Sequence, residues 1–537
     1  MQINKNKIIL IALLIFSFFL RFYKLSDYPI QLNHDEVSQL YDTYSIIKTG
    51  KDIYGNKLPL AFPSTGDYKV GHYIYISTIP VWLFGDREFA IRIPSAFFGT
   101  LTVLAVFLFV NVLIKNWTIA TLATFLVAIL PSEIFYSRKS FEGEIGVCLE
   151  FFGLFCLVNF SKNKLWTFLG IFLMSLSMYV YTSFTMTIPL ILIYLIFQFR
   201  NEINRRQLFY IFLSWFIFII PLILISLTNP DIRFRAATVF VNQDINFGRA
   251  LMITNNIFKS YLDVTFFKFL SQFNPTYLFI NGLDLTNQGI LGIGPLLLFQ
   301  FPLVILGIAF LLRDKLYLRV RNLLFILAVI SIIPSALTFE EYSPHRAMPA
   351  FVIFSIVSAF GLYWLILLIK RRILSFGLRT LIYGLLSLFI IFNFIYFLRI
   401  YTQSYTFEKP EKIQYPFKQV ALYAWSQYNN FDTIIFDPKF GKTAPMIGVG
   451  SQYYFAYYGN YSPEKLQKEL KMNPEKRGMA FDKFSIREVY WPKDKDLKNT
   501  LLIVSPWTLP LSDVNENSVI KRFNFYDGEL AFYAIKL

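Results

Sequence analysis

Three consecutive residues, His34, Asp35 and Glu36, carry the side chains best able to do chemistry in the first polar stretch of the chain. A carboxylate held beside a hydroxyl can take its proton as a general base. The triplet follows an apolar segment, residues 8–22, so it lies just outside a candidate membrane span. Because acidic pairs also occur on ordinary solvated helices, its meaning depends on the residues around it.

Basic side chains occur in three separate polar stretches, as Lys69, Arg138 and Arg346. Arginine offers a planar fork to phosphate oxygens and lysine a compact charge, so together they would suit the phosphate of a lipid carrier. Each could equally anchor a membrane interface without binding a ligand. Further possible donor or acceptor contacts in these stretches are His34, Asp67, His72, Arg92, Glu142 and His345.

This set of side chains matches the demands of sugar transfer from a polyprenyl phosphate. The leaving group is already a stable anion, so the reaction needs no general acid. The acceptor hydroxyl must lose a proton, which one positioned carboxylate can take. Cations must stabilise the charge that grows on the departing phosphate. A glycosidase would instead need two carboxylates that flank a cleft.

The composition is that of a multi-pass protein of the cell membrane. Of 537 residues, 55% are hydrophobic, with 60 Phe and 33 Tyr, and the mean hydropathy is +0.48. So much apolar surface exceeds what a soluble core can bury, so the excess must face membrane lipid. The net charge of +16 lies in short gaps between apolar runs rather than on one continuous surface, which argues against nucleic acid as a partner.

The apolar runs predict about eleven spans. If Lys5 and Lys7 are cytoplasmic, the other basic gaps are cytoplasmic too, and an odd number of spans leaves the C-terminus outside. The predicted spans lie near residues 8–22, 91–114, 117–131, 144–160, 165–181, 183–199, 208–227, 290–312, 322–337, 347–369 and 380–398.

The predicted fold is therefore a polytopic α-helical membrane protein with a small C-terminal α/β domain. Residues 1–400 would form the membrane domain and residues 401–537 an extracytoplasmic domain. In the first outer loop, residues 37–49 can form an amphipathic juxtamembrane helix, and residues 72–84 an apolar segment along the membrane. The outer loops of the membrane domain are predicted at residues 23–90, 132–143, 228–289 and 338–346.

The tail differs from the rest because its charges nearly balance and its apolar runs are short. Residues 432–436, 501–505 and 530–536 are typical of strands, and residues 416–428 and 462–472 of helices. Elsewhere, Cys148 and Cys156 share one apolar segment eight residues apart, too far to bond to each other on a helix, and are expected to be buried.

Several loop motifs, in order, resemble those of the membrane-integral glycosyltransferases of the C superfamily, in the branch of protein O-mannosyltransferases and lipid A aminoarabinose transferases. The closest likeness is to bacterial members with a C-terminal outer domain, and it covers residues 8–400 and, more loosely, the tail. The motifs are Asn33-His34-Asp35-Glu36, Thr49-Gly50-Lys51-Asp52 with Gly55, Gly66-Asp67-Tyr68-Lys69, Gly85–Pro94 with Arg92, Ser137-Arg138 with Phe141-Glu142, Asn274-Pro275 with Leu278-Phe279 and Gly282, and Pro344-His345-Arg346 with Pro349.

The resemblance implies that Asp35 is the catalytic carboxylate, with Glu36 beside it, and that Lys69 contacts the carrier phosphate. It implies transfer of a hexosyl or pentosyl group, with inversion, from a polyprenyl-phosphate sugar to a hydroxyl or phosphate of a protein, glycan or glycolipid. The site would face outward, in a pathway of protein glycosylation or of the cell envelope. One departure is that Val70 and Gly71 follow Lys69 where the family commonly has two prolines.

Two other functions remain open at this point. A metal-dependent oligosaccharide transferase could use Asp35, Glu142 and Glu144 as oxygen ligands for Mg²⁺ or Mn²⁺, although no Asp-x-Asp pair lies in the first outer loop. A lipid or solute transporter would need ionisable residues inside its spans, where only Glu150 is evident. The expected reaction uses no metal and no other cofactor.

Overall fold

The computed structural model describes residues 5–63, 68–159, 164–203, 205–228, 239–283, 290, 292–373, 375–404, 410–473 and 478–537. The chain forms two compact units, one of Met1–Tyr23 with Pro94–Tyr401 and one of Lys24–Ile93 with Thr402–Leu537. The last of the three breaks between them, after Tyr401, lies beside the boundary predicted at residue 400. The sequence did not predict that the first outer loop would form one compact unit with the tail.

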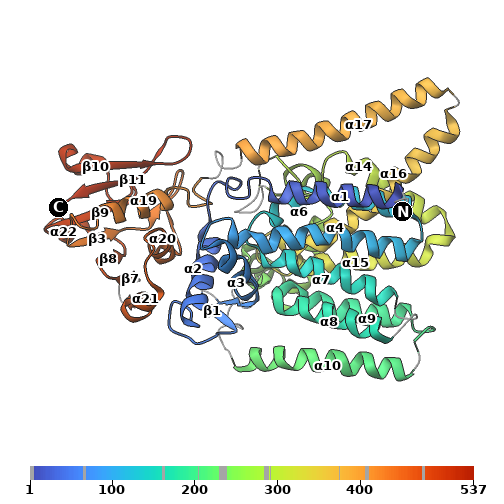
Figure 1. Ribbon diagram of the computed structural model, residues 1–537, viewed down its shortest axis with the longest axis horizontal. Coiled ribbons are helices and arrows are strands. Elements are labelled where there is room, and N and C mark those ends of the chain that lie inside the picture. The colour runs from blue at the N-terminus through green and yellow to red at the C-terminus, as the bar shows by residue number, and fades with distance from the viewer. Residues whose placement is uncertain are drawn as a thin grey trace. The chain divides into compact units, whose positions relative to one another are not determined.

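The first unit is a bundle of apolar helices (Figure 1). The two most extensively packed helices of the bundle meet through small residues, because Gly307 of α14 and Gly361 of α16 lie so close to the partner backbone that a Cβ would clash. The helices are α1 (Lys5–Phe22), α4 (Ile93–Ile114), α5 (Trp117–Ala128), α6 (Pro131–Ser137), α7 (Glu142–Val158), α8 (Lys164–Val180), α9 (Thr182–Gln198), α10 (Arg205–Thr228), α12 (Ile245–Thr254), α13 (Ile257–Ser271), α14 (Gln300–Arg313), α15 (Leu318–Ala336), α16 (Met348–Arg372) and α17 (Phe376–Arg399).

The bundle has the composition of a membrane domain. Among the described residues, four helical stretches are long and apolar enough to cross a membrane, or five if α5 and α6, bent by 55°, form one span. Other helices are apolar but shorter, among them Leu165–Val180 and Gln300–Arg313. Membrane localisation and a mostly helical fold are therefore confirmed, whereas the count of eleven spans stays a prediction.

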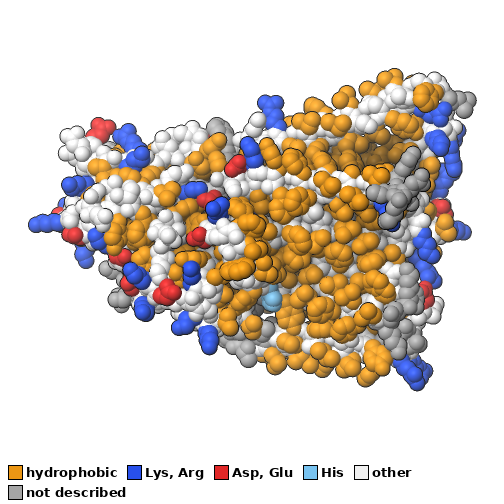
Figure 2. All heavy atoms as spheres, viewed as in Figure 1, with side chains coloured by type: hydrophobic (Ala, Val, Ile, Leu, Met, Phe, Trp, Pro, Cys, Tyr) orange, Lys and Arg blue, Asp and Glu red, His pale blue; other side chains and the backbone are white. Residues whose placement is uncertain are grey.

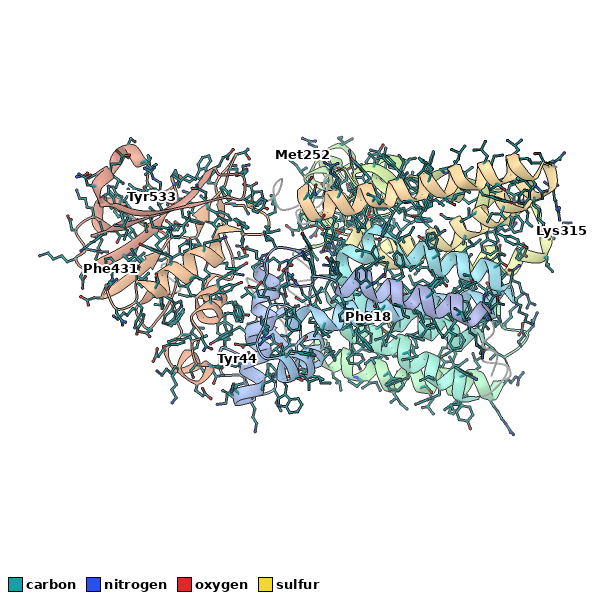
Figure 3. All side chains as sticks on the ribbon, turned by 45° about the horizontal axis from the view of Figure 1, so that its top comes forward. Phe18, Tyr44, Met252, Lys315, Phe431 and Tyr533 are labelled. Carbon is teal, nitrogen blue, oxygen red and sulfur yellow. The ribbon has the colours of Figure 1, made fainter. Side chains whose placement is uncertain are left out.

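Hydrophobic side chains cover the flanks of the helices, and Lys and Arg gather at one end of the bundle (Figure 2). Two of the basic gaps meet there, since Arg319 Nη1 lies 2.8 Å from Glu202 Oε1 and the Gln198 side chain donates to the Arg319 carbonyl. In the side-chain view, Phe18 lies on the flank of α1 and Lys315 at this basic end (Figure 3). Cys148 and Cys156 are free and buried, as predicted.

In the second unit, the first outer loop forms two helices and a short hairpin. Helix α2 (His34–Thr49) packs against α3 (His72–Phe84), and strands β1 (Ala61–Pro63) and β2 (Tyr68–Val70) pair with Phe62 opposite Lys69. Both helices were predicted, but α2 begins at His34 rather than at residue 37. The reactive triplet is therefore the first turn of the helix and not the loop before it.

The tail contains a seven-stranded mixed sheet in the order β10-β11-β9-β3-β8-β7-β6. Strand β3 runs parallel to both of its neighbours. The buried side chains of Ile435, Leu502 and Tyr533, from three adjacent strands, belong to one hydrophobic core of the sheet. The strands are β3 (Thr433–Phe436), β6 (Lys471–Asn473), β7 (Gly478–Phe481), β8 (Phe484–Ile486), β9 (Thr500–Val504), β10 (Val519–Asn524) and β11 (Leu530–Lys536), with a separate pair β4 (Lys439–Phe440) and β5 (Met446–Ile447).

The α/β character predicted for the tail is confirmed, with helices α19 (Pro416–Ser426) and α21 (Pro463–Glu469) and three strands close to their predicted positions. The sequence missed β4 to β8 and β10, and also α20 (Ser451–Tyr458) and α22 (Trp491–Asp494). Strands β4 to β8 have only two to four residues each, so the residue pattern alone does not separate them from loops.

Helix α20 joins the tail to the first outer loop through tyrosine hydroxyls. Tyr454 donates to the Leu32 carbonyl at 3.0 Å, and Tyr453 donates to the Asp42 carboxylate at 3.3 Å and to the Pro63 carbonyl at 3.2 Å. Both rings are fully buried. Buried hydroxyls need such partners, so these bonds fix how the loop segment before and along α2 packs on the tail.

Candidate active site

The first turn of α2 is closed by a capping box. The Asn33 side chain accepts the Glu36 backbone N–H at 2.9 Å, and the Glu36 carboxylate accepts the Asn33 N–H at 3.1 Å. These two bonds satisfy donors that a helix start otherwise leaves unpaired. They also fix where the side chain of Asp35, between the two, leaves the helix.

Glu36 has a second buried partner, Arg92. The Arg92 Nε lies 2.9 Å from Glu36 Oε1 and its Nη2 lies 3.2 Å from Oε2, and the side chains are 0% and 2% exposed. The same guanidinium donates to the carbonyls of Leu25, Pro29 and Gln31 at 2.7–2.9 Å. A charge removed from water must be paired and fully hydrogen-bonded, and here the fork of arginine meets that demand.

Asp35 lies on the open side of the same turn. Its Oδ1 is 2.5 Å from Lys69 Nζ and 3.5 Å from His34 Nε2. The Asp35 side chain is 34% exposed, whereas that of Lys69 is 10% exposed and also reaches Ser38 Oγ at 3.4 Å. The structure thus brings Asp35, Lys69 and His34 together, and gives Asp35 the access to solvent that Glu36 lacks.

Two other residues of the first outer loop, His72 and Asp67, were predicted to contact substrate. His72 begins α3 and is half-buried. Asp67 lies outside the described residues, so its predicted contact with substrate stays a prediction.

In the first unit, the guanidinium of Arg138 is turned to the end of α1. Its Nη1 donates to the carbonyls of Leu20 and Arg21 at 2.8 and 3.2 Å, and its Nη2 to that of Tyr23 at 2.9 Å. The last carbonyls of a helix have no hydrogen-bond donors within the helix. Arg138 provides such donors, and its positive charge complements the negative end of the helix dipole. The residue is 3% exposed. A contact with carrier phosphate stays a prediction.

Two loops that the sequence singled out meet in the same unit. The ring of His345 lies edge-on to that of Phe141, with centroids 6.3 Å apart, next to Glu142 at the start of α7. The neighbouring Arg346 has its Nη1 3.5 Å from Glu340 Oε2, and its side chain keeps 15% of its surface exposed. Lys69 belongs to the second unit, so the meeting of Lys69, Arg138 and Arg346 at one phosphate stays a prediction.

Residues 239–283, which lie in the outer loop predicted at residues 228–289, contact the loop that carries Arg346. Lys268 pairs with Asp244, with Nζ and Oδ2 2.5 Å apart, and donates to the carbonyls of Thr338, Phe339 and Glu340. The Lys268 side chain is only 3% exposed. The buried ammonium therefore holds in place the loop that carries Arg346.

Ionisable side chains inside the helical bundle are more numerous than the sequence indicated. Besides Glu150, the residues Arg21, Glu133 and Glu144 are fully buried. Gly99 makes room for two of them, since a Cβ there would come within 3.0 Å of both Glu144 Oε1 and Arg21 Nε. The argument against a transporter from scarcity of such residues is therefore weaker than the sequence suggested.

The part of the chain that the structure describes contains no group of three or more His, Cys, Asp or Glu side chains placed so that they could bind a metal ion. Of the alternative ligand set, Asp35 pairs with Lys69, Glu142 begins α7, and Glu144 is enclosed beside Arg21. A metal requirement stays untested.

One acidic group behind the site has a perturbed pKa. Burial raises the pKa of Asp42 well above its usual range, and the nearby charge of Asp52 raises it further. The carboxyl group is fixed by the Ile53 N–H and the Tyr453 hydroxyl, each at 3.3 Å. Asp42 lies two turns after Asp35 on α2, so it belongs to the packing between this helix and the tail.

A sequence signal for the role of Glu36 was available. Asn33 followed three residues later by Glu36 has the spacing of a capping box, which assigns the glutamate to the helix start. No comparable signal exists for Ser38, Glu340 or the Lys268–Asp244 pair, because each depends on contacts between distant segments.

Comparisons with known proteins bear on this arrangement. Residues 72–225 match the family described as dolichyl-phosphate-mannose-protein mannosyltransferase. The fold is similar to that of ArnT from Cupriavidus metallidurans in the apo state, with a TM-score of 0.57 at 10% identity over 99% of this chain and 98% of that chain. The same protein bound to undecaprenyl phosphate gives 0.57 at 10% identity, over 98% and 97%.

An oligosaccharyltransferase of Archaeoglobus fulgidus, in complex with Zn and sulfate, is also similar. It gives a TM-score of 0.50 at 12% identity, over 84% of this chain and 61% of that chain. None of the curated proteins matches the sequence. At these identities the structural matches show a shared fold.

The buried pair predicts that Glu36 and Asp35 respond differently to neutral substitutions. Glu36→Gln leaves the Arg92 charge buried without its partner, which is expected to lower the free energy of unfolding by about 3–5 kcal/mol. Asp35→Asn, at a partly exposed position, should change it little. Thermal unfolding and protease resistance of the purified protein measure both.

A matched control is Glu516→Gln, which breaks an exposed pair with Arg522 in the same unit. If Glu36→Gln unfolds no more readily than Glu516→Gln, the buried pair does not hold the site together.

Proposed function

We propose that this chain, a membrane-integral glycosyltransferase of the C superfamily by its family match and its shared fold, transfers a hexosyl or pentosyl group from a polyprenyl-phosphate sugar. The acceptor is a hydroxyl or phosphate of a protein, glycan or glycolipid. The observation that carries the proposal is the partly exposed Asp35 carboxylate, held against Lys69 at the start of α2. ArnT of C. metallidurans, which shares the fold, binds undecaprenyl phosphate, and this supports a carrier of that class.

In the proposed reaction, Asp35 takes the proton of the acceptor hydroxyl while its oxygen attacks the anomeric carbon. The bond from this carbon to the carrier phosphate breaks, and the phosphate leaves as a stable anion without a proton. One displacement inverts the configuration. A base within hydrogen-bond reach of its proton contributes about 10²–10⁴-fold to a rate of this kind.

Lys69 has two tasks in this proposal. Its ammonium lies 2.5 Å from Asp35 Oδ1 and holds the carboxylate in place. The departing phosphate offers a second anion of higher charge, and Lys69 would contact both. Arg346, and as predicted from the sequence Arg138, would add positive charge at the same phosphate.

Glu36 and Arg92 are positioning residues in this mechanism. Neither side chain is exposed enough to meet substrate, since Arg92 is 0% and Glu36 2% exposed. Their pair fixes the first turn of α2, and hence the direction in which Asp35 points. The sequence-based assignment of Glu36 as a catalytic neighbour of Asp35 stays a prediction, with this indirect role as its proposed form.

The site and the tail are proposed to face the outer side of the cytoplasmic membrane. The support is the clustering of Lys and Arg at one end of the helical bundle, because such residues are enriched on the cytoplasmic side. The proposed reaction uses no metal, because the carrier phosphate leaves as a stable anion and Lys and Arg can stabilise its charge.

For the base itself, the prediction concerns turnover in Asp35→Asn, which keeps the shape and removes the charge. Turnover should fall about 10²-fold or more, with folding and carrier binding retained. The measurement is single-turnover transfer from a radiolabelled polyprenyl-phosphate sugar, with glycolipid and protein fractions counted separately. A chelator added to the parent enzyme should leave the rate unchanged.

Near-normal turnover in a well-folded Asp35→Asn protein would remove Asp35 from the chemistry. Loss of activity in chelator, restored by Mg²⁺ or Mn²⁺, would replace the metal-free reaction with a metal-dependent one.

For the carrier phosphate, Arg346→Ala should lower kcat/KM about ten- to a hundredfold, because a charge-assisted contact to phosphate contributes about 1.5–3 kcal/mol. Arg346→Lys should recover only part of this, since a point charge cannot bind two oxygens. Donor titrations measure the effect, with Arg372→Ala, in the basic end of α16, as the control.

Equal donor titrations for Arg346→Ala and Arg372→Ala would place the phosphate elsewhere. Arg138→Ala is less informative, since it also removes the bonds to the carbonyls of Leu20, Arg21 and Tyr23 at the end of α1 and is expected to destabilise the bundle.

For orientation, a reporter that is active only outside the cytoplasm should be active when fused after Leu537. A reporter that works only in the cytoplasm should be silent at that position. Activity of the cytoplasmic reporter alone would reverse the proposed topology and move the site to the other side.

A further inference from the structure

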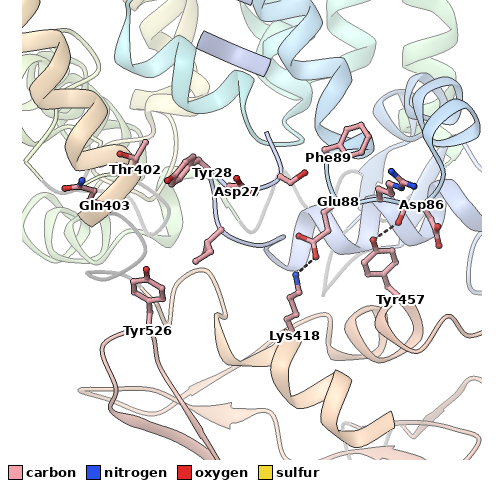
Figure 4. A pocket seen from close by; sticks show the side chains of 13 residues that line it. Asp27, Tyr28, Asp86, Glu88, Phe89, Thr402, Gln403, Lys418, Tyr457 and Tyr526 are labelled. Atoms are coloured by element: carbon pink, nitrogen blue, oxygen red, sulfur yellow. Dashed lines mark hydrogen bonds and ion pairs between the residues drawn. The ribbon is translucent and has the colours of Figure 1, made fainter. Parts of the chain in front are cut away.

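A pocket of about 800 Å³ opens in the second unit, apart from Asp35 and Lys69, which do not line it. Its wall combines two parts of the sequence, as Figure 4 shows. Asp27, Tyr28 and Glu88 come from the first outer loop, and Lys418, Tyr457 and Tyr526 from the tail. A volume of this size accommodates a ligand of several rings.

Part of the wall is held rigidly. Lys418 Nζ lies 2.6 Å from Glu88 Oε1, and the Tyr458 hydroxyl donates to the same oxygen at 2.9 Å. The Tyr457 hydroxyl donates to the Asp86 carbonyl at 2.6 Å. These bonds cross from the tail to the first outer loop, so the pocket is formed by the packing of one on the other within this unit (Figure 4).

The remaining wall alternates rings and polar groups. Tyr526 projects from the turn between β10 and β11 and is 45% exposed, and Tyr28 lies on the opposite side in Figure 4. Asp27 and Gln403 add a carboxylate and an amide. Flat rings and carboxylate or amide oxygens together suit a ligand that has apolar ring faces and many hydroxyl groups.

The lining also argues against other classes of ligand. A polyprenyl chain needs an apolar groove, whereas this wall carries carboxylates, lysine, arginine and amide groups. An anion such as a second phosphate would meet more carboxylates than cations, because Asp27, Asp86 and Glu88 face only Arg87 and Lys418. The charge favours a neutral or cationic ligand.

We infer that this pocket binds a neutral or amino-substituted saccharide, as a sugar of the acceptor other than the one that receives the transferred group. The identity of the saccharide as acceptor rests on the proposed function, whereas its binding does not. Tyr28 and Tyr526 would stack on sugar rings, and Asp27 and Gln403 would bind hydroxyl or ammonium groups. The Glu88–Lys418 pair holds the two walls at a fixed separation.

The lining segments come from places where the chain leaves the apolar helices. Asp27 follows the end of α1 at Phe22, the segment with Glu88 precedes the start of α4 at Ile93, and Gln403 follows the end of α17 at Arg399. The lining segments are therefore close, along the sequence, to the ends of apolar helices. Both a glycolipid head group and a glycan on a protein could supply the same chemistry.

Direct binding to the purified full-length protein, without donor, tests the inference. Saturation-transfer NMR measures binding of chitobiose, glucosamine, mannobiose and glucuronic acid, and chitobiose on a lipid anchor in vesicles distinguishes a head group from a free glycan. We expect at least one neutral or amino saccharide to bind and glucuronic acid to bind least. Asp27→Asn should weaken this binding about tenfold, as loss of one hydrogen bond to a charged group predicts. Tyr526→Ala should weaken it by about the same factor, because it removes a ring on which the sugar stacks.

Two controls match these variants. Asp496→Asn and Tyr490→Ala change exposed residues of the same types outside the pocket, and should bind like the parent. Asp35→Asn should also bind the saccharide normally, so a failed transfer reaction and an empty pocket can be told apart. Absence of binding for every probe, or equal binding in the pocket and control variants, would overturn the inference.

Discussion

The proposed site depends on the buried ion pair between the guanidinium of Arg92 and the carboxylate of Glu36. The guanidinium holds the Glu36 carboxylate and three backbone carbonyls between residues 25 and 31, and so ties the chain after α1 to the first turn of α2. Removing one partner of a buried ion pair leaves the other charge without solvent or a counter-charge, which strongly destabilises the fold. Because Asp35 lies between the two capping residues, its direction follows from this network.

The same network explains why two neighbouring carboxylates can have different tasks. Glu36 is enclosed and fully bonded, so it can hold the helix but cannot meet a substrate. Asp35 is partly exposed and pairs with a lysine on a facing hairpin, and in the proposed reaction it takes the proton of the acceptor hydroxyl. The tail supports this arrangement from behind, since tyrosines of α20 donate to the Leu32 and Pro63 carbonyls on either side of α2.

How far the sequence predicts the molecule depends on whether a residue acts through local or distant contacts. Apolar length predicted several of the apolar helices, and short apolar runs predicted β3, β9 and β11, whereas β6, β7 and β8, of three or four residues each, are too short to show a pattern. Asp35 and Lys69, 34 residues apart, were both candidates, but their contact needs the β1–β2 hairpin. Burial depends on the tertiary structure. The local sequence therefore does not distinguish Arg138, which donates to carbonyls at the end of α1, from an arginine that binds phosphate.

The central claim is that Asp35 and Lys69 act as one catalytic unit. A double-mutant cycle on turnover tests it directly, with Asp35→Asn, Lys69→Met and the double variant assayed in single turnovers with saturating polyprenyl-phosphate sugar. Groups that act together lose most of their effect with the first substitution. The account predicts that the double variant is hardly slower than Asp35→Asn alone. Losses that multiply, as for independent residues, would contradict it.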